Sequence, residues 1–312
     1  MKKINGTQHL DGGINRYDGE HFGDVIWSEL PTDFAEKKPR FYVSEAQKTD
    51  FNAFFKVNYA FSPILNGYFD VQYRHVTHNT EGSDRRKIPF NHDLIWRFFN
   101  PKIGLVVENS ERSRFHASFA VAHREPNRND ILDVLTGVVP SSEQLLNTEL
   151  GWQGAFKSLN LSINFYQMYY NNQLVVTGKI NDVGEQVRTN VPKSYRAGVE
   201  LSAEWQIFNR LSLDYNLTLS QNKVLNFKEL RDNFDTFIQD KIEHGTTDIA
   251  FSPNVVANAI LTYKIFEKEK AGFDVALVGK HVGGEQQGVE HRIVEGDARL
   301  LLALGQEGHV EG

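Results

Sequence analysis

The sequence predicts an all-β fold, namely a segment of an antiparallel transmembrane β-barrel. Residues 194–220 hold two runs of alternating apolar and polar side chains, each about ten residues long, separated by a break at 208–210. Side chains of a strand point to opposite faces in turn, so each run has one apolar and one polar face. Strands of soluble proteins usually have about five or six residues. About 9–11 residues cross a bilayer at a tilt, which is the length of each run.

The connections between the expected strands support the same fold, because short and long ones alternate along the chain. The short ones lie near Ser62, Ser110, Ser158, Asn209 and Lys268. The long ones cover residues 30–48, 75–93, 124–147, 171–194 and 221–253. Transmembrane barrels have short turns on the periplasmic side and long loops outside. The turn at 208–210 is therefore predicted to face the periplasm.

Composition agrees with a barrel and excludes other classes. Aromatic residues make up 12% of the sequence, and barrels carry aromatic girdles at both membrane interfaces. No run of about 18 apolar residues occurs, so no transmembrane helix is expected. A formal charge of −6 without a basic stripe argues against a nucleic-acid partner. Since the chain has no cysteine, disulfides and thiolate metal sites are excluded.

Taken in order, about eleven strands are expected. They lie at 24–29, 50–61, 65–74, 95–108, 115–121, 149–156, 159–166, 194–207, 211–220, 255–265 and 273–280. The dipeptide Asn100-Pro101 is expected to interrupt the fourth of them. Three connections have predicted characters of their own: 78–92 is turn-rich, 174–193 is a loop with room for a small hairpin, and 221–253 is acidic and irregular.

Aromatic side chains gather beside the short turns, where the inner girdle of a barrel should lie. They are Tyr59, Phe61, Phe156, Trp205, Phe208, Tyr263 and Phe266. The odd-numbered residues of 197–207 should form an apolar band about 25 Å tall on the lipid side. Charged residues within this band would contradict a barrel.

Four segments resemble, in order and spacing, the C-terminal half of the barrel of TonB-dependent outer-membrane receptors of the Bacteroidetes type. They are Phe119–Asp130 (FAVAHREPNRND), Ser141–Gly151 (SSEQLLNTELG), Asn190–Glu200 (NVPKSYRAGVE) and Asp248–Ala259 (DIAFSPNVVANA). The resemblance covers roughly residues 20–285. It implies a barrel of about 22 strands, of which this chain would supply about half, in the cell outer membrane.

The resemblance also implies a function and partners. The family imports siderophores, cobalamin or glycans with energy that TonB passes from the inner membrane, so we expect a receptor and transporter, not an enzyme. Expected partners are outer-membrane lipid, TonB acting through a plug domain, and a surface lipoprotein. No cofactor is implied.

The ends of the sequence lead to a further expectation. The N-terminus does not read as a signal peptide, the plug is not present, and the last residues lose the strand alternation. We therefore expect a partial loop or strand start at 1–19, a barrel segment at 20–285 and an aberrant tail at 286–312. A gene fragment or disrupted reading frame of this kind would not be competent for transport alone.

Charged residues supply the candidate ligand contacts. Arg124 and Arg128 begin a long outer loop and could contact an anionic ligand. Glu200 and Glu204 share a strand face about 13 Å apart, at about 3.3 Å per residue. This distance is too long for the carboxylate pair of a glycosidase, so both are expected to line the lumen.

No catalytic motif occurs, and no metal site is expected. His116, His123 and Glu125 come close in sequence, but His116 should face the lumen while the other two lie at a strand end. The alternative to a receptor is a soluble carbohydrate-binding or glycan-active β-domain that uses exposed aromatics and carboxylates. Dependence on detergent would separate the two.

Overall fold

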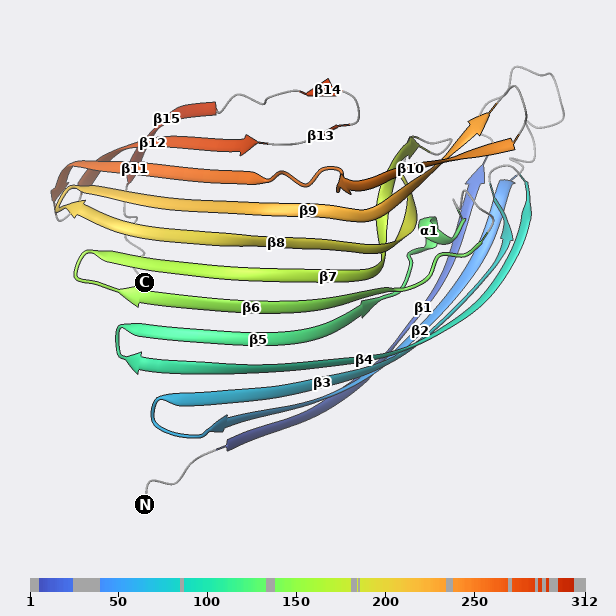
Figure 1. Ribbon diagram of the computed structural model, residues 1–312, viewed down its shortest axis with the longest axis horizontal. Helices are drawn as coiled ribbons and strands as arrows, with labels where there is room; N and C mark the ends of the chain where they lie inside the picture. Colours follow the sequence, from blue (N-terminus) through green and yellow to red (C-terminus); the bar gives the residue numbers. More distant parts are fainter. Residues whose placement is uncertain are drawn as a thin grey trace, which may run out of the picture.

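The computed structural model describes residues 6–24, 40–84, 87–132, 138–180, 184, 186–233, 238–268, 271–283, 286–287, 290–291 and 297–305. Most of them form one curved antiparallel sheet (Figure 1). Its strands are β1 (Gly6–Asp24), β2 (Arg40–Ala60), β3 (Leu65–Ser83), β4 (Pro89–Ser110), β5 (Ser113–Arg124), β6 (Glu143–Ala155), β7 (Leu159–Ile180), β8 (Gln186–Phe208), β9 (Leu211–Asn233), β10 (Ile238–Asp248), β11 (Val255–Lys268), β12 (Ala271–Gly283) and β15 (Asp297–Gly305). The predicted all-β antiparallel fold is confirmed.

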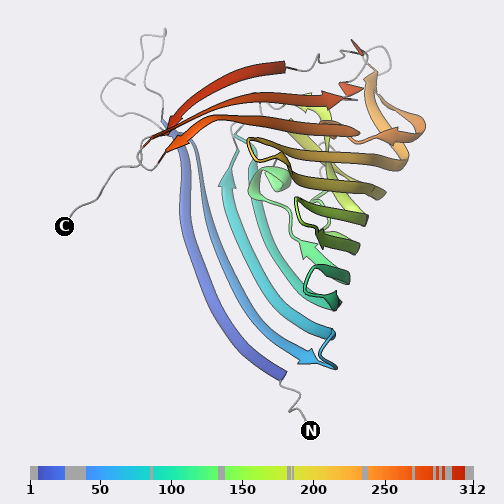
Figure 2. The ribbon, with the colours of Figure 1, turned by 90° about the vertical axis from the view of Figure 1, so that its left-hand side faces the viewer.

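Neighbouring strands follow the chain order from β1 to β9 and continue with β11, β12 and β15. Strand β10 pairs with the second half of β9, the half after Asn222. The sheet curls into an arc whose two edges are β1 and β15 (Figure 2). Helix α1 (Arg128–Leu132) lies inside the arc, and β13 (Gln286–Gln287) pairs with β14 (Glu290–His291). In the part of the chain that the structure describes, no helix is long and apolar enough to cross a membrane.

The short turns lie together at one end of the sheet, as predicted (Figure 1). The opposite end differs from the prediction, because the strands continue through most of the expected loops. β3 runs to Ser83 and β4 begins at Pro89, so residues 78–92 are mostly strand. Residues 174–193 extend β7 and β8 and pair with each other, which agrees with the small hairpin allowed for there, and much of 221–253 forms the β9–β10 hairpin.

A physical reason explains these misassigned loops. Beyond the bilayer the strands have no continuous lipid face, and their few buried apolar side chains, Val175, Val191, Val224 and Ile249, pack in a small cluster. The long apolar alternation that marks a strand in the sequence is therefore lost. The backbone ladder does not need that alternation and continues. The strands β7, β8 and β9 therefore reach 22, 23 and 23 residues.

Pro101 does not interrupt β4, which was also predicted wrongly. β4 pairs with β3 through Val71↔Pro101 without a break. Its pairing with β5 instead ends at Lys102, one residue away. Proline has no N–H to donate to a ladder, so the dipeptide marks the point where β4 and β5 separate.

The edges of the sheet carry strands at the two ends of the chain, where the sequence pattern indicated at most a strand start within 1–19. Gly6–Asp24 forms β1, which pairs with β2 along its length, and Asp297–Gly305 forms β15 beside β12. The candidate strand at 24–29 lies outside the described residues apart from Asp24, which ends β1. The division of the chain at 19/20 and 285/286 stays a prediction.

The strand register agrees with the apolar band predicted on β8 over residues 199–205, whereas Ala197, at the end of the predicted band, pairs with Gln221. The members of the band from 199 to 205 pair across the sheet as Val199↔Leu219, Leu201↔Leu217, Ala203↔Tyr215 and Trp205↔Leu213, with no charged residue among them. Trp205 and Leu219 remain 44% and 48% exposed. Exposed apolar surface of this extent is unfavourable in water and suits contact with lipid.

Aromatic rings also gather beside the short turns, as expected for the inner girdle. Tyr59 and Phe61 meet edge to face with ring centroids 5.0 Å apart. Trp152 and Phe156 lie 6.3 Å apart at the next turn but one. Phe208 is 70% exposed at the β8–β9 turn. Amphipathic and aromatic rings are typical of the membrane–water interface.

Candidate functional site

The inner face of the arc is polar and holds the predicted lumen residues Glu200 and Glu204. Asn164 Nδ2 donates a hydrogen bond to Glu200 Oε2 at 3.2 Å. Asn160 Nδ2 donates one to Glu204 Oε2 at 3.1 Å. Both glutamates therefore have a neighbour on β7 that orients them, and they sit on one strand face as expected.

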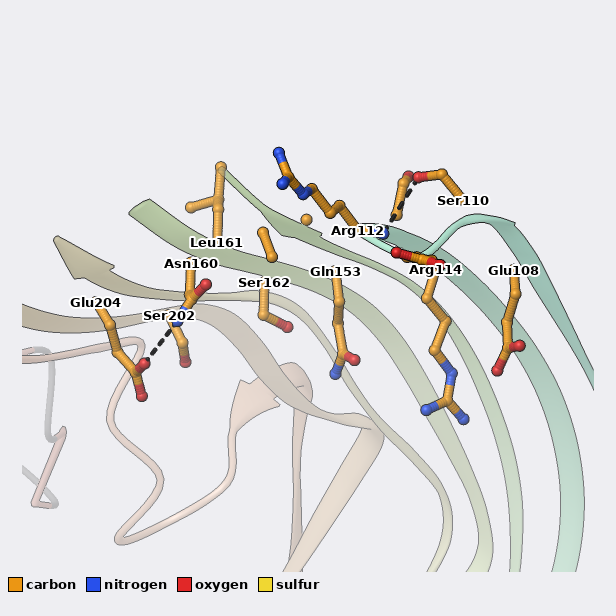
Figure 3. Close-up of a pocket in the computed structure, with 14 residues that line it drawn as sticks. Glu108, Ser110, Arg112, Arg114, Gln153, Asn160, Leu161, Ser162, Ser202 and Glu204 are labelled. Carbon is orange, nitrogen blue, oxygen red and sulfur yellow. Dashed lines mark hydrogen bonds between the residues drawn. The ribbon is translucent and has the colours of Figure 1, made fainter. Parts of the chain in front are cut away.

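The two glutamates line different cavities. Glu204 belongs to a cavity of about 620 Å³ near the short turns, where Glu108, Arg114 and Gln153 project to the same side (Figure 3). Glu200 belongs to a cavity of about 400 Å³ farther along the wall, toward the long connections. The structure thus does not bring them together as one site.

Aromatic rings cover glycines on this inner face. Each ring belongs to the residue directly opposite the glycine on the neighbouring strand, and a Cβ on the glycine would lie less than 3 Å from it. The pairs are Tyr68 over Gly104, His116 over Gly151 and Tyr166 over Gly198. A larger residue at any of these glycines would therefore clash with the ring beside it.

A chain of polar side chains joins four strands where β4 and β5 have separated. His123 Nδ1 lies 2.8 Å from Asn100 Oδ1, and Gln144 Nε2 lies 3.0 Å from His123 Nε2. Asn171 Nδ2 donates to Gln144 Oε1 at 2.8 Å. The His123 ring stacks on Phe98 at 5.4 Å. These contacts link the strands at a place where the backbone ladder of β4 and β5 does not.

An ionic cluster, made of Lys48, Asp50, Arg74 and Glu125, lies at the outer rim of the lumen. Arg74 Nη2 is 2.5 Å from Asp50 Oδ2 and 3.2 Å from Glu125 Oε1. Lys48 Nζ is 2.8 Å from Glu125 Oε1. The Glu125 side chain is only 9% exposed. Burial alone would raise the pKa of the Glu125 carboxyl, but Lys48, a backbone hydrogen bond and Arg74 together lower it.

Glu125 begins a short segment, residues 125–132, which we call the inner strut. Asn127 and Asp130 cap helix α1 reciprocally, since each backbone N–H donates to the other side chain at 2.9 Å. Arg128 Nη2 donates to Ser44 Oγ on β2 at 2.7 Å. Arg188 on β8 lies 3.5 Å from Asp130. The strut therefore contacts β2 on one side and β8 on the other.

The two predicted arginines lie close in sequence but have different surroundings. Arg124 ends β5, is 62% exposed and pairs with Glu143 on β6 at 2.9 Å. Arg128 belongs to the inner strut and points to β2. The sequence pattern did not indicate Lys48 or Arg74. Charged residues at the outer end of a lumen face were the available signal, but nothing in the sequence pairs them with Glu125.

The histidines considered for a metal site have separate partners. His116 covers Gly151, His123 belongs to the polar chain, and Glu125 belongs to the ionic cluster. Among the residues that the structure describes, no group of three His, Asp or Glu side chains could hold a metal ion.

Comparison with known proteins identifies the family. The family model described as "TonB dependent receptor-like, beta-barrel" matches residues 4–293. The chain belongs to this family. TonB-dependent receptors are outer-membrane barrels, so this chain is an outer-membrane β-barrel protein, and the soluble-domain alternative is not supported. No curated protein shows significant sequence similarity to it.

Solved structures of receptors share the fold. The ferric-catecholate import receptor Fiu from E. coli K12 has a TM-score of 0.62 and 14% identity, with 98% of this chain and 46% of Fiu covered. The ferric yersiniabactin uptake receptor FyuA from Yersinia pestis has a TM-score of 0.63 and 15% identity, with 96% and 44% covered. The siderophore receptor PiuA from Acinetobacter baumannii has a TM-score of 0.64 and 13% identity, with 91% and 44% covered. The chain thus spans less than half the length of these receptors.

His78, beside the ionic cluster, gives a prediction about pH. It lies on β3 beyond the lipid-facing residues, is 7% exposed, and its pKa is lowered from 6.5 by burial and by the charges of Lys48 and Arg128, which outweigh Glu125. Below pH 6.5 the unfolded chain takes up this proton more readily than the folded one, so the free energy of unfolding decreases as the pH is lowered. We expect His78→Gln to weaken the loss of stability between pH 6.5 and pH 5, measured by denaturant unfolding in detergent.

The exposed His9 supplies the control for this prediction, because His9→Gln removes a histidine that has no buried environment. This variant should keep the pH dependence of the parent chain. Equal pH dependence of all three proteins would contradict the role given to His78.

Proposed function

We propose that this chain forms part of the wall of an import receptor, which takes up a siderophore, cobalamin or a glycan-type ligand. This proposal rests on the difference between the two faces of the sheet. One face has an apolar band without charges on β8 and β9, and the other face is polar and has cavities. The receptors of similar fold support this, since Fiu and FyuA are import and uptake receptors for ferric ligands. Binding would be non-covalent, and energy would come from TonB through a plug domain.

The proposal includes residue roles and partners. Arg124 and Arg128 at the rim would contact ligand first, and Glu200 and Glu204 would line its path along the lumen. The motif order suggests a receptor of the Bacteroidetes type, in which a surface lipoprotein would be a further partner. Transport also requires a closed wall, because each unpaired backbone group of β1 or β15 would cost several kcal/mol in lipid.

Single cysteines would test the orientation of the wall, since the sequence has no cysteine of its own. Cysteine at 200, 202 or 204 should react with a water-soluble maleimide when the chain is in lipid bilayers. Cysteine at 199, 201 or 203 should be protected, because these positions face lipid. Labelling is measured by mass spectrometry before and after the bilayer is dissolved.

Phe208→Cys at the exposed short turn provides the positive control for reagent access. All seven positions should react after unfolding. Uniform labelling of 199–204 in bilayers, or a chain that stays soluble and monomeric without detergent, would contradict the proposed function.

A further inference from the structure

The connection between β10 and β11, residues 249–254, leaves the sheet ladder and is fixed to β9. Ile249 N–H donates to Asn222 O at 2.9 Å, and Ser220 N–H donates to Asn254 O at 2.8 Å. Asn222 is 4% exposed and its amide also donates toward the carbonyls of Ser252 and Pro253, each at 3.4 Å. The connection is therefore held at both ends and in its middle.

Phe251, in the middle of this connection, has an unusual conformation. Its φ is +56°, in the left-handed region that bulky residues rarely adopt. Its side chain is nevertheless 52% exposed and lines the cavity of about 400 Å³ that contains Glu200. A strained residue persists only where its surroundings hold it, and such residues concentrate at functional sites.

Arg196 is one of the groups that hold the connection. Its Nη1 donates to Ser252 Oγ at 2.9 Å and lies 3.4 Å from Asn222 Oδ1. This guanidinium therefore supports the residue next to Phe251. A buried amide and an arginine thus hold the connection from which Phe251 lines a polar cavity.

The same cavity is lined by several kinds of polar group. Its lining includes two carboxylates, an amide, hydroxyls and a phenol, from Glu149, Glu200, Asn164, Thr218, Ser220 and Tyr166. Each carboxylate has one oxygen in a hydrogen bond with an asparagine amide, and carboxylates can accept several more. The volume is within the range of small-molecule pockets, about 300–1,000 Å³.

The charges decide which ligand fits. Two carboxylates face one arginine, and Arg196 is already bound to Ser252 and Asn222. An anionic ligand would be repelled, so the cavity does not suit the acidic groups of a siderophore. A neutral ring with several hydroxyls has an apolar face to stack on Phe251 and donors for both carboxylates.

We propose that this cavity is a subsite for a neutral polyhydroxylated ring of pyranose size, stacked on Phe251 and held by Glu149 and Glu200. The subsite rests on the proposed function, because the ring would reach it only through the lumen. Among the three ligand types of that proposal, it selects the glycan type.

Phe251→Gly gives a test that separates binding from folding. Glycine adopts a φ of +56° without strain, so this variant should melt at the same temperature as the parent chain or higher. It removes the stacking surface, so binding of neutral sugars should weaken about tenfold. Saturation-transfer NMR and titration calorimetry of the full chain in detergent, with glucose, maltotriose and xylotriose as probes, measure both effects.

Further variants sharpen the test. Phe251→Tyr should keep sugar binding, and Glu200→Gln should weaken it without removing the ring. Phe208→Gly, which deletes an exposed aromatic side chain at the short turn, should leave binding unchanged. If Phe251→Gly failed to fold, the Tyr and Gln variants would still decide the question.

Three results would overturn the subsite: no binding of any neutral sugar, binding that Phe251→Gly leaves intact, or binding of tetramethylammonium instead of sugars. Each can occur while the cysteine pattern on β8 stays alternating, in which case the receptor wall stands and only the subsite fails. A uniform cysteine pattern would instead remove the lumen on which the subsite depends.

Discussion

Replacement of Arg74 by alanine is expected to lower the free energy of unfolding by up to about 3–5 kcal/mol, the cost of removing one partner of a fully buried ion pair. Arg74 is the common partner of Asp50 and Glu125, whose side chains are 17% and 9% exposed. Without the guanidinium both carboxylates stay in a poorly hydrated place, and only Glu125 retains a cation, Lys48. Denaturant unfolding in detergent, followed by circular dichroism, measures the loss.

Lys228→Ala is the control, because it removes an ion pair whose two side chains are both exposed, Lys228 with Glu243 at 2.8 Å. Exposed pairs contribute little, so this variant should destabilise the chain far less than Arg74→Ala. Arg74→Lys should fall between the two, since lysine keeps the charge but cannot contact two carboxylates with a planar group. Equal destabilisation by Arg74→Ala and Lys228→Ala would show that the cluster is not buried in solution.

Arg74→Ala should also loosen the inner strut, residues 125–132. Arg74 and Lys48 hold Glu125, and Glu125 is the first residue of the segment that carries helix α1. With one of these partners removed, limited proteolysis should cut within 125–132 sooner than in the parent chain. The inner strut would then be a segment across the outer part of the lumen that can detach from its contacts.

The inner half of this fold was predictable because lipid on one side and water on the other impose a strict pattern. The pairing of Leu201 with Leu217 and of Trp205 with Leu213 follows from that parity and one tight turn. The outer half was not predictable in the same way. At Gln186–Lys193 and Asn222–Asn233 the few buried apolar side chains, such as Val191 and Val224, pack with Val175 and Ile249 in a small cluster, so these parts of the strands lack the long apolar–polar alternation of a lipid-facing wall.

The ionic cluster could not be predicted from the sequence for a different reason. Its partners are separated by 24, 51 and 77 residues along the chain. In the sequence Glu125 lies close to His123, whereas in the fold Glu125 forms ion pairs with Arg74 and Lys48. Phe251 was equally hidden, because its left-handed backbone depends on Asn222 and Arg196 from other strands.

Leu201→Arg and Ser202→Arg should differ strongly in how much they reduce folding into lipid bilayers, although the two positions are adjacent on β8. Leu201 lies in the middle of the lipid band, between Ile163 and Leu217. A charged residue there is expected to cost about 2–4 kcal/mol at the bilayer midplane. Ser202 faces the cavity of about 620 Å³, whose lining includes Glu108 and Glu204.

Ser202→Arg loses the hydrogen bond from Ser202 Oγ to Asn216 Oδ1 but places its charge in a wet lumen beside carboxylates. Its effect should stay within about 1 kcal/mol. The fraction of chain that folds into lipid bilayers, measured by resistance to protease, should therefore fall steeply for Leu201→Arg and little for Ser202→Arg. The reverse order would place lipid on the polar face, and equal losses would mean that neither face meets lipid.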